Sequence, residues 1–578
     1  MSPSLKTRYE WRTLPWRRIQ GKVFKLQRRI YRASRRRQVK LVHKLQRLLA
    51  KSWYARLLAV RRVTQDNKGK RTAGIDGIKK LTPPQRLEMA QSLTTFSKPR
   101  PLRRIWIPKP GKTEKRPLSI PTMRDRATQA LIKLALEPQW EAKLDPNMYG
   151  FRLGRSCQDA IEAVYRTIFR QPKFVLSVDI RGCFDNISHD AILKKSRAPT
   201  WMKRLIKGWL KCGVLDNGFH RTERGSPQGG VISPLLALIA LQGLERHIKR
   251  LGTQTYPLYV VAYADDIVIL ARREKDIHRA QATLAKWLHA IGLELNPQKT
   301  TISHTLQGES PGFEFLGFQV RQHPAGQYQA RRGYKTRITP GAKNVKRHLE
   351  YLKVILQAHQ GMPQQALIGK LNPIIQGWCQ YYRGVNSYQT FDKLSSILFH
   401  QLLSWAKRRH ANLNVHQIVS RYWSVNADGK WAFQSKDGPR LRFHRQTRFQ
   451  VHIKVRTDRS PYDGDWTYWG SRLRRYPGVT PLKSSLLRSQ EGKCRLCGLN
   501  FLPGALIEVH HLDGNHDNHR RHNLALLHRH CHDQAHSADT SAATGPYDKS
   551  PVREEPYEVE SLTYGSEAES GRRLPGLG

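Results

Sequence analysis

The sequence predicts a multidomain α+β protein, and three observations lead to this fold class. Its 578 residues exceed what one hydrophobic core organises, and about 150 residues per domain suggests roughly three to four domains. Apolar, β-branched runs such as 173–180 and 258–270 are typical of strands and alternate with helical stretches, whereas 340–420 is helical, basic and aromatic. A compact Cys/His-rich module fills residues 488–537.

The net charge indicates the class of partner. Lys and Arg number 101 against 44 Asp and Glu, a formal charge of +57, and the natural counterpart of such an excess is a nucleic-acid backbone. Seven cysteines do not make a disulfide framework in this length, and one Cys-x-x-Cys pair indicates metal in a reducing compartment. The longest strongly apolar run, Val231–Leu241, is interrupted by Ser233 and Pro234 and cannot span a bilayer. With no secretion signal visible, these features favour a cytosolic nucleic-acid-binding protein.

The first 62 residues carry 20 Lys or Arg and a single acid, Glu10. Apolar residues recur there at helical spacing with basic residues between them, which predicts a helix with one packed face and one basic face. The packed face is assigned to Leu41, Val42, Leu45, Leu48, Leu49 and Trp53. Because acids are nearly absent, we expect the basic face to contact phosphates.

Two adjacent carboxylates, Asp265 and Asp266, lie in the middle of the apolar run 258–270. Their flanks are typical of two short strands with the acids at the bend, where no glycine eases the turn. Neighbouring carboxylates between buried strands repel each other unless cations bind them. Asp179 ends another strongly apolar strand, so three carboxylates would converge if the strands are neighbours. Such a cluster suits phosphoryl transfer with two Mg²⁺ ions about 3.5–4 Å apart.

Several further motifs accompany this cluster. In chain order the set comprises the strand pair 103–121 around a Pro-Gly loop, Val178-Asp-Ile-Arg-Gly-Cys-Phe184, Arg224-Gly-Ser-Pro-Gln-Gly-Gly230 and Tyr263-Ala-Asp-Asp266. From about Thr72 to Phe318 the chain thereby resembles the reverse transcriptases encoded by group II introns of bacteria and organelles. The resemblance implies a right-hand-like polymerase, with fingers and palm built on an antiparallel sheet over 72–335 and an α-helical thumb after them.

The same resemblance assigns roles to individual residues. It implies that Asp179, Asp265 and Asp266 are catalytic and bind two Mg²⁺ ions, with the backbone carbonyl of Ile180 as a further ligand. Four residues would contact the incoming dNTP: Lys109 and Arg116 on the triphosphate, Phe184 as a steric gate against a ribose 2′-hydroxyl, and Gln228 on the nucleotide. A viral RNA replicase also uses a double-aspartate hairpin, but the bulky Phe184 favours dNTPs.

Residues 336–420 resemble the thumb, or maturase domain X, of the same family, most recognisably in Gly377-Trp-Cys-Gln-Tyr-Tyr-Arg-Gly384. These aromatic residues beside Arg suit stacking on unpaired bases, but packing into a helical core explains them equally well. The resemblance implies that this domain and the basic helical extension 1–71 hold intron RNA in its splicing-competent fold, as a lariat ribonucleoprotein. Residues 421–480 take the position of the family's small DNA-binding region.

Two x₂-spaced pairs, Cys494-Arg-Leu-Cys497 and His528-Arg-His-Cys531, suit a tetrahedral structural Zn²⁺ site. The surrounding module, 481–540, resembles the HNH endonuclease fold, a ββα unit that grips one divalent metal. In that fold a fourth cysteine is common where this chain has His528. The resemblance implies that His511 is the general base and that Asn523 orients its loop.

The endonuclease metal, Mg²⁺ or Mn²⁺, would be bound by His510, His532 and His536. Four further histidines of the module are expected to face solvent or phosphate: His516, His519, His522 and His530. The tail 541–578 is acidic and poor in apolar residues, and we expect it to be disordered.

These interpretations predict a group II intron-encoded protein that copies intron RNA by target-primed reverse transcription, assists splicing and nicks target DNA. Its partners would be intron RNA, target DNA and dNTPs, without a membrane, in the bacterial cytosol or an organelle. The alternative is an RNA-binding splicing cofactor with vestigial enzymatic sites. The intact Asp179, Asp265, Asp266 and His511 argue against that alternative.

Overall fold

The computed structural model describes residues 10–94, 96–108, 115–326, 328, 330–425, 431–434 and 438–539. The expectations for Lys109 and for the tail 541–578 lie outside these described residues. Among the helices that are described, none is long and apolar enough to cross a membrane.

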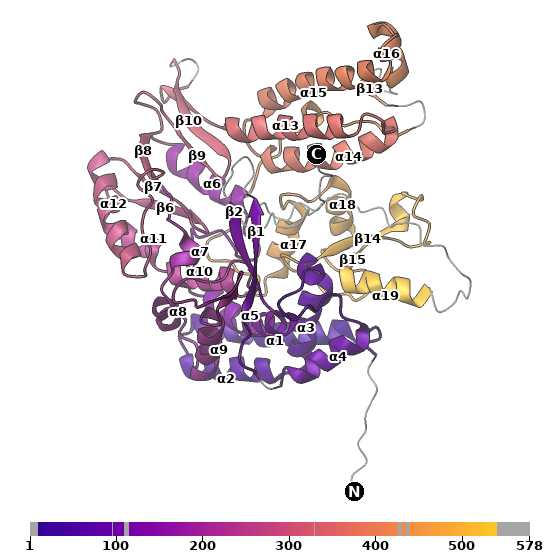
Figure 1. The fold of residues 1–578 in the computed structure, drawn as a ribbon. Coiled ribbons are helices and arrows are strands. Elements are labelled where there is room, and N and C mark those ends of the chain that lie inside the picture. The colour runs from indigo at the N-terminus through magenta and orange to yellow at the C-terminus, as the bar shows by residue number, and fades with distance from the viewer. Residues whose placement is uncertain are drawn as a thin grey trace.

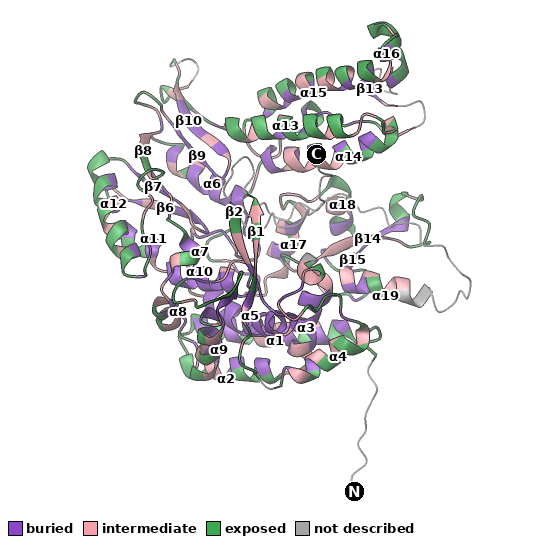
Figure 2. Ribbon diagram, viewed as in Figure 1, coloured by how far each residue is buried: buried purple, intermediate pink, exposed green. Residues whose placement is uncertain are grey.

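The N-terminal helices surround one central helix, α5 (Met123–Glu141), in the lower part of Figure 1. They are α1 (Trp16–Arg35), α2 (Val39–Lys51), α3 (Trp53–Arg61) and α4 (Pro83–Ser92), and a short π-helical turn, Arg62–Asp66, follows α3. The side chain of Thr122 caps α5 by accepting a hydrogen bond from the Asp125 amide. Because α5 is buried on almost every side, it serves as the core of this bundle (Figure 2).

The helix predicted near residues 41–53 is interrupted at Ser52. This residue has an extended backbone (φ −67°, ψ 126°), so α2 ends before it and α3 begins after it. Val42, Leu45 and Leu49 are buried as predicted, but Leu41 and Leu48 are exposed. The assignment of these two leucines to the packed face was wrong, because only the central stripe of α2 meets α1 and α5.

The region that the resemblance assigns to the fingers contains a sheet of four strands in the order β2-β1-β4-β5, and we keep the names fingers, palm and thumb for the regions assigned in this way. Its long members, β1 (Leu102–Pro108) and β2 (Lys115–Ile120), form the predicted antiparallel pair. The short strands β4 (Val214–Leu215) and β5 (Phe219–His220) extend it. Three helices link the fingers to the palm: α7 (Cys183–Asn186), α8 (His189–Lys195) and α9 (Thr200–Leu210).

The palm is a four-stranded antiparallel sheet in the order β6-β7-β3-β8. Its strands are β3 (Phe174–Val178), β6 (Tyr259–Tyr263), β7 (Asp266–Ala271) and β8 (Thr301–His304). Four helices accompany the sheet: α6 (Cys157–Ile168), α10 (Ser233–Leu241), α11 (Leu244–Lys249) and α12 (Glu274–His289). The central strands are apolar on both faces because each face packs into a different core. Leu176 and Ile269 belong to the core of the N-terminal helices, whereas Val175 and Leu270 belong to the core shared with the thumb.

A second antiparallel sheet, β11-β10-β9, connects palm and thumb. Its strands are β9 (Phe313–Phe315), β10 (Phe318–Pro324) and β11 (Tyr334–Pro340). The thumb follows as α13 (Ala342–Ala358), α14 (Gln364–Tyr382), α15 (Tyr388–Arg409) and α16 (Val415–Tyr422). A small hairpin, β12 (Trp423–Val425) and β13 (Trp431–Phe433), buries Trp423 and Phe433 in the thumb core.

After the thumb the chain returns to the N-terminal helices, and its last described elements form a ββα unit beside them (Figure 1). The elements are a 3₁₀ turn (His444–Gln446), α17 (Trp466–Arg474), α18 (Pro481–Ser489), β14 (Ile507–His511), β15 (Leu524–His528) and α19 (Arg529–Asp539). Gln534 of α19 donates to the backbone carbonyls of Arg12 and Leu14, and Arg61 of α3 lies 3.7 Å from the Asp533 carboxylate. The last module is therefore joined to the first helices of the chain.

Candidate active sites

The first candidate site is the bend between β6 and β7. Tyr263 pairs with Asp266, so only Ala264 and Asp265 form the turn, and Ala264 adopts a left-handed φ of 57°. In the adjacent strand Val178 pairs with Ile267, and this register places Asp179 beside Asp266 at the same edge of the sheet. The structure thus brings together the three carboxylates that the sequence singled out.

Burial makes this cluster unfavourable when all three groups are charged. Desolvation, followed by the charges of Asp265 and Asp179, raises the pKa of Asp266 to about 7. Desolvation and Asp179 also raise the pKa of Asp265, although Arg116 opposes the shift. Divalent cations would relieve this repulsion, and oxygen-only donors suit Mg²⁺. The donor set therefore fits the metal that the sequence predicts.

Asp179 and Ile180 lie on a backbone segment fixed from the other side. The Asn296 amide donates to the Asp179 carbonyl (2.8 Å), and the Arg181 amide donates to the Glu294 carbonyl (2.9 Å). This bridge between Ile180 and Leu295 uses the Asp179 carbonyl and the Arg181 amide, which flank Ile180, but not the carbonyl of Ile180 itself. The Ile180 carbonyl is thus not committed to the bridge, as a metal ligand requires. Lys299, whose ammonium lies 3.7 Å from the Asp179 carboxylate, adds a cation beside the cluster.

A segment that sequence reasoning did not single out supports the bend from behind. The Tyr149 amide donates to the Ala262 carbonyl, and the Ala262 amide donates to the Asn147 carbonyl. The next residue, Gly150, is so close to the bend that a Cβ there would lie 2.3 Å from the Ala264 nitrogen. Only glycine fits at this position without moving the turn that carries Asp265.

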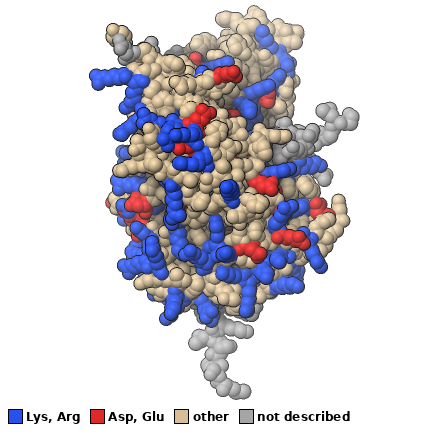
Figure 3. Space-filling model, turned by 90° about the vertical axis from the view of Figure 1, so that its left-hand side faces the viewer, with Lys and Arg blue, Asp and Glu red and all other residues tan. Residues whose placement is uncertain are grey.

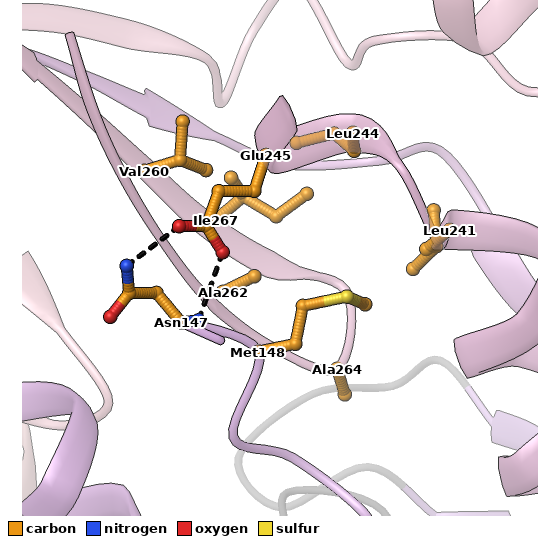
Figure 4. Close-up of a pocket in the computed structure, with 9 residues that line it drawn as sticks. All are labelled: Asn147, Met148, Leu241, Leu244, Glu245, Val260, Ala262, Ala264 and Ile267. Atoms are coloured by element: carbon orange, nitrogen blue, oxygen red, sulfur yellow. Dashed lines mark hydrogen bonds between the residues drawn. The ribbon is translucent and has the colours of Figure 1, made fainter. Parts of the chain in front are cut away.

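This supporting segment is itself held by Glu245 of α11. The Glu245 carboxylate accepts hydrogen bonds from the Asn147 amide (2.9 Å) and from its side-chain nitrogen (2.7 Å), next to Ala262 and Ala264 (Figure 4). Glu245 is buried and also pairs with Lys249. No local motif marks Glu245 or Asn147, because their contact joins segments about a hundred residues apart.

The predicted nucleotide-contacting residues face the cluster from the fingers side. Arg116 of β2 acts electrostatically on both Asp265 and Asp185. Gln228 lies next to Asp185, with its side-chain nitrogen 3.3 Å from the carboxylate, and its carbonyl accepts from the Ser119 amide of β2. Phe184 is half-buried and packs edge-on against Phe151, with ring centroids 5.9 Å apart. These three residues therefore surround the space in front of the carboxylates.

The second candidate site is a buried cluster of three cysteines and one histidine. The ligand atoms of Cys494, Cys497, His528 and Cys531 all lie within 4.8 Å of one another. Burial lowers the pKa of His528, but hydrogen bonds with Cys494 and Cys497 outweigh it and raise the pKa to about 9. This donor set fits tetrahedral Zn²⁺, whose binding would displace the protons that these groups share.

The third candidate site is a group of three histidines on the same module. The side-chain nitrogens of His510, His532 and His536 lie within 4.8 Å of one another, with His532 and His536 one turn apart on α19. Glu508 of β14 accepts a hydrogen bond from the Arg529 guanidinium (2.5 Å), and its carboxylate lies 3.2 Å from the Nδ1 of His532. The sequence analysis did not predict a role for Glu508. Its position two residues before His510, which places both side chains on the same face of a strand, could have indicated that it lies beside the histidine cluster.

His511 ends β14 beside this group, at the start of the loop 512–522. Its Nε2 lies 3.3 Å from the Nδ1 of His519. Asn523 is buried and holds the loop, since its amide group bonds Asp513 in both directions and donates to the Asn518 carbonyl. His516 and His519 are exposed as expected.

His530 contradicts the expectation that it faces solvent or phosphate. It is buried, its ring stacks on that of His528 at 5.0 Å, and burial lowers its pKa to about 3. Its Nδ1 lies 3.4 Å from the Gln20 side chain of α1. The prediction was wrong because the covering helix is 510 positions away in the sequence.

The aromatic residues of Gly377–Gly384 pack inside the thumb, which decides between the two interpretations left open above. Tyr381 and Tyr382 are buried, and their hydroxyls donate to the carbonyls of Leu316 and Gly317. Trp378 stacks on His348 at 4.7 Å. These residues therefore join the thumb to the β9–β10 turn of the palm.

Comparison with known proteins agrees with this arrangement. The family "Reverse transcriptase (RNA-dependent DNA polymerase)" matches residues 107–320, "N-terminal domain of reverse transcriptase" matches 11–93, and "Group II intron, maturase-specific domain" matches 345–423. The group II intron-encoded protein LtrA of Lactococcus lactis subsp. cremoris is 24% identical over 468 residues, covering 65% of this chain and 76% of LtrA.

The matches to two further relatives cover similar shares of those proteins. The protein YkfC of Escherichia coli (strain K12) is 30% identical over 303 residues, covering 45% of this chain and 78% of YkfC. Maturase-like protein 1 of Euglena gracilis is 28% identical over 400 residues, covering 66% of this chain and 79% of that protein.

Proposed function

The chain belongs to the reverse transcriptases that carry a group II intron maturase domain, and we propose that it combines three activities on one intron. It polymerises DNA on an RNA template and assists splicing, as the family does. It further nicks target DNA with its C-terminal ββα module and extends the resulting 3′-end by copying intron RNA. The observation that carries the proposal is the presence, in one chain, of a converged carboxylate cluster and a separate histidine cluster.

In the polymerase site, Asp179, Asp265 and Asp266 would hold two Mg²⁺ ions with the Ile180 carbonyl. When bound, the ions supply an activated primer 3′-hydroxyl and charge compensation for the leaving pyrophosphate. Arg116 is placed to bind the triphosphate, because it already acts on Asp265 across the site. Phe184, which packs against Phe151, would lie beside the sugar of a bound dNTP and exclude a 2′-hydroxyl, and Gln228 would orient the nucleotide from the loop beside β2.

In the endonuclease site, His511 would accept a proton from the attacking water, a task suited to a neutral imidazole near pH 7. His510, His532 and His536 would hold one Mg²⁺ or Mn²⁺, which supplies Lewis-acid stabilisation of the scissile phosphodiester. Asn523 orients the loop that follows His511, and Glu508 fixes the ring of His532 through its Nδ1. The Cys494, Cys497, His528 and Cys531 cluster would bind Zn²⁺ and hold the module together.

The maturase activity rests on the RNA-binding surface. Lys and Arg side chains cover much of the face shown in Figure 3, and few carboxylates interrupt them. Such a surface suits a folded RNA, bound through its phosphates. The alternative, a splicing cofactor with vestigial enzymatic sites, does not explain why the carboxylates converge at an electrostatic cost and why glycine is required at position 150 behind them.

Primer extension by the purified full-length chain tests the polymerase. We expect extension of a DNA primer on an RNA template with dNTPs and Mg²⁺, loss of extension in Asp265→Asn, and normal extension in the control Asp190→Asn, an exposed carboxylate on α8. Equally efficient incorporation of rNTPs would contradict the assignment. Splicing of the cognate intron at reduced Mg²⁺ tests the maturase, which fails if the protein leaves the Mg²⁺ requirement unchanged.

A further inference from the structure

The ribbon formed by β10 and β11 carries positive charges that oppose each other directly. Arg321 pairs with Arg337 across the two strands, and two positions further along the same face Lys335 pairs with His323, whose pKa is lowered by burial and by Arg321 and Arg337. Arg321, Lys335 and Arg337 are exposed. Like charges opposite each other destabilise a strand pair, so this face is arranged for an anion rather than for stability.

A cavity of about 650 Å³ lies between the ribbon and the end of α6. Tyr165 and Phe169 line it from α6, with ring centroids 5.2 Å apart, and Tyr334 lines it from β11. The Arg332 guanidinium lies over the Phe169 ring at 4.3 Å and donates to the Phe169 carbonyl. Arg331, Lys335 and Arg337 complete the charged part of the lining, and among the described lining residues there is no acid.

The edge of β11 also offers backbone groups to this cavity. The Ile338 backbone amide donates to the Asn386 side-chain oxygen (3.1 Å), and the Ile338 carbonyl accepts from the Asn386 backbone amide (2.8 Å). The backbone polar groups of Ile338 therefore face away from β10. Strand alternation turns the amides and carbonyls of Thr336 and Tyr334 to the same outer side. The Tyr334 hydroxyl is buried and, among the described residues, has no hydrogen-bond partner.

We propose that this cavity binds an unpaired nucleotide of a nucleic-acid strand and that the phosphates beside it lie along the β10–β11 ribbon. Tyr165 and Phe169 offer aromatic surface for the base, and the outward backbone of β11 and the Tyr334 hydroxyl meet its polar edge. Arg321, Lys335 and Arg337 contact the phosphates. A duplex does not fit, because its bases are stacked and paired. The cavity lies toward the end of the ribbon opposite the β9–β10 turn.

The inference is tested by cross-linking the full-length protein to a short single-stranded RNA that contains 4-thiouridine. The adduct is expected on Tyr165, Phe169 or Tyr334, and duplex RNA of the same sequence should compete poorly. A single-stranded DNA of the same sequence, with the corresponding thio-base, shows which nucleic acid the site accepts. Cross-linking of both RNA and DNA shows a site for any unpaired strand, whereas cross-linking of RNA alone shows that the protein recognises the 2′-hydroxyl. Adducts only elsewhere, or equal competition by the duplex, would overturn the proposal.

Substitution separates binding from folding. In Arg321→Gln/Arg337→Gln we expect at least about tenfold weaker binding of the single strand. The slope of log binding constant against log salt concentration should become shallower by roughly 1.4, about 0.7 for each of two lost phosphate contacts. The melting temperature should be unchanged or higher, because the pair of like charges is gone. Tyr165→Ala should weaken binding roughly tenfold through the lost stacking. The control is Lys275→Gln/Lys286→Gln on α12, two exposed cations with the same loss of charge.

If the control weakens binding as much as the ribbon variant, the ribbon is only part of a general basic surface and the proposal is wrong. Primer extension on a short template is measured in parallel and should be unchanged in the ribbon variant. Absence of extension in the unaltered chain would instead contradict the polymerase assignment and leave the binding result valid.

Discussion

The carboxylate cluster and the histidine cluster, which we propose as two metal sites, are built in different ways. Asp179, Asp265 and Asp266 lie at the ends of strands of the main core, and desolvation, followed by the charges of Asp265 and Asp179, raises the pKa of Asp266. His510, His532 and His536 belong to a small module with few core residues. The first site is strained and held by a large fold. The second lies in a small module, whose folding we expect to depend on Zn²⁺ bound at the neighbouring Cys/His cluster.

Removal of a Zn²⁺ ligand should give the largest difference between the two sites, because it should abolish DNA nicking and leave primer extension intact. In Cys497→Ser the ββα module loses the cluster around which its core is built, and we expect DNA nicking to fall below detection. Primer extension should remain near its original rate. A zinc assay on the purified proteins, with Cys212→Ser as a control for a cysteine outside the module, checks the cause; equal zinc content in Cys497→Ser and the parent would refute it.

Phe184→Ala tests the site in front of the carboxylates. Opening the space that Phe184 occupies should raise the use of rNTPs relative to dNTPs by about 10- to 100-fold, while nicking is unchanged. Competition of rNTPs with dNTPs in primer extension measures this ratio. Phe151→Ala, which removes the packing partner of Phe184, should give a smaller change; an equal or larger one would show that Phe184 is only a core residue.

The role of Glu508 sharpens the description of the histidine cluster. Glu508→Gln keeps the size of the side chain but removes the charge that fixes His532, and we expect 10- to 100-fold weaker metal activation of nicking, as for other residues that orient metal ligands. Titration of Mg²⁺ or Mn²⁺ in the nicking assay gives the apparent affinity. Glu491→Gln, an exposed acid of the same module, is the control, and the same shift in both variants would speak against a specific role.

The smallest expected effect concerns the stability of the metal-free protein. The pKa of Asp266 is raised from an ordinary value near 4 to about 7, so the folded protein binds a proton more tightly than the unfolded chain. Stability is therefore lost as pH rises between about 4 and 7, and the loss is complete above the folded pKa. Asp266→Asn removes this loss, so its advantage in melting temperature should grow between about pH 5 and pH 8.

Mg²⁺ should reduce that advantage, because the cations stabilise the charged cluster of the unaltered protein. Thermal melts of the parent, Asp266→Asn and the control Asp190→Asn provide the comparison. A gap that does not change with pH would mean that Asp266 is not the group that titrates.

The two sites also differ in what the sequence alone could reveal. Asp265, Asp266 and the Cys-x-x-Cys pair lie in short segments whose residue types already imply their chemistry, so they were found without a structure. Gly150 and Glu245 support the bend across segments about a hundred residues apart, and no local pattern encodes such contacts.

The predictions of the fold divide in the same way, between features that depend on local sequence and features that depend on contacts between distant segments. The hairpins and the helical thumb agree with the periodicity of the sequence, and the order β14-β15-α19 is the one that the resemblance to the HNH fold implied. The burial of His530 and the exposure of Leu41 depend on which distant helix covers them, and both were assigned wrongly. Periodicity predicts which face of a helix can be buried, whereas tertiary packing decides how wide the buried stripe becomes.

The central claim is that this chain contains two independent metal-dependent active sites. The most direct test measures primer extension and DNA nicking in the same preparations of the parent, Asp265→Asn and His511→Ala. We predict that Asp265→Asn loses extension by at least about a thousandfold and keeps nicking, and that His511→Ala loses nicking by about 10²- to 10⁴-fold and keeps extension. Loss of both activities in either variant would contradict the claim.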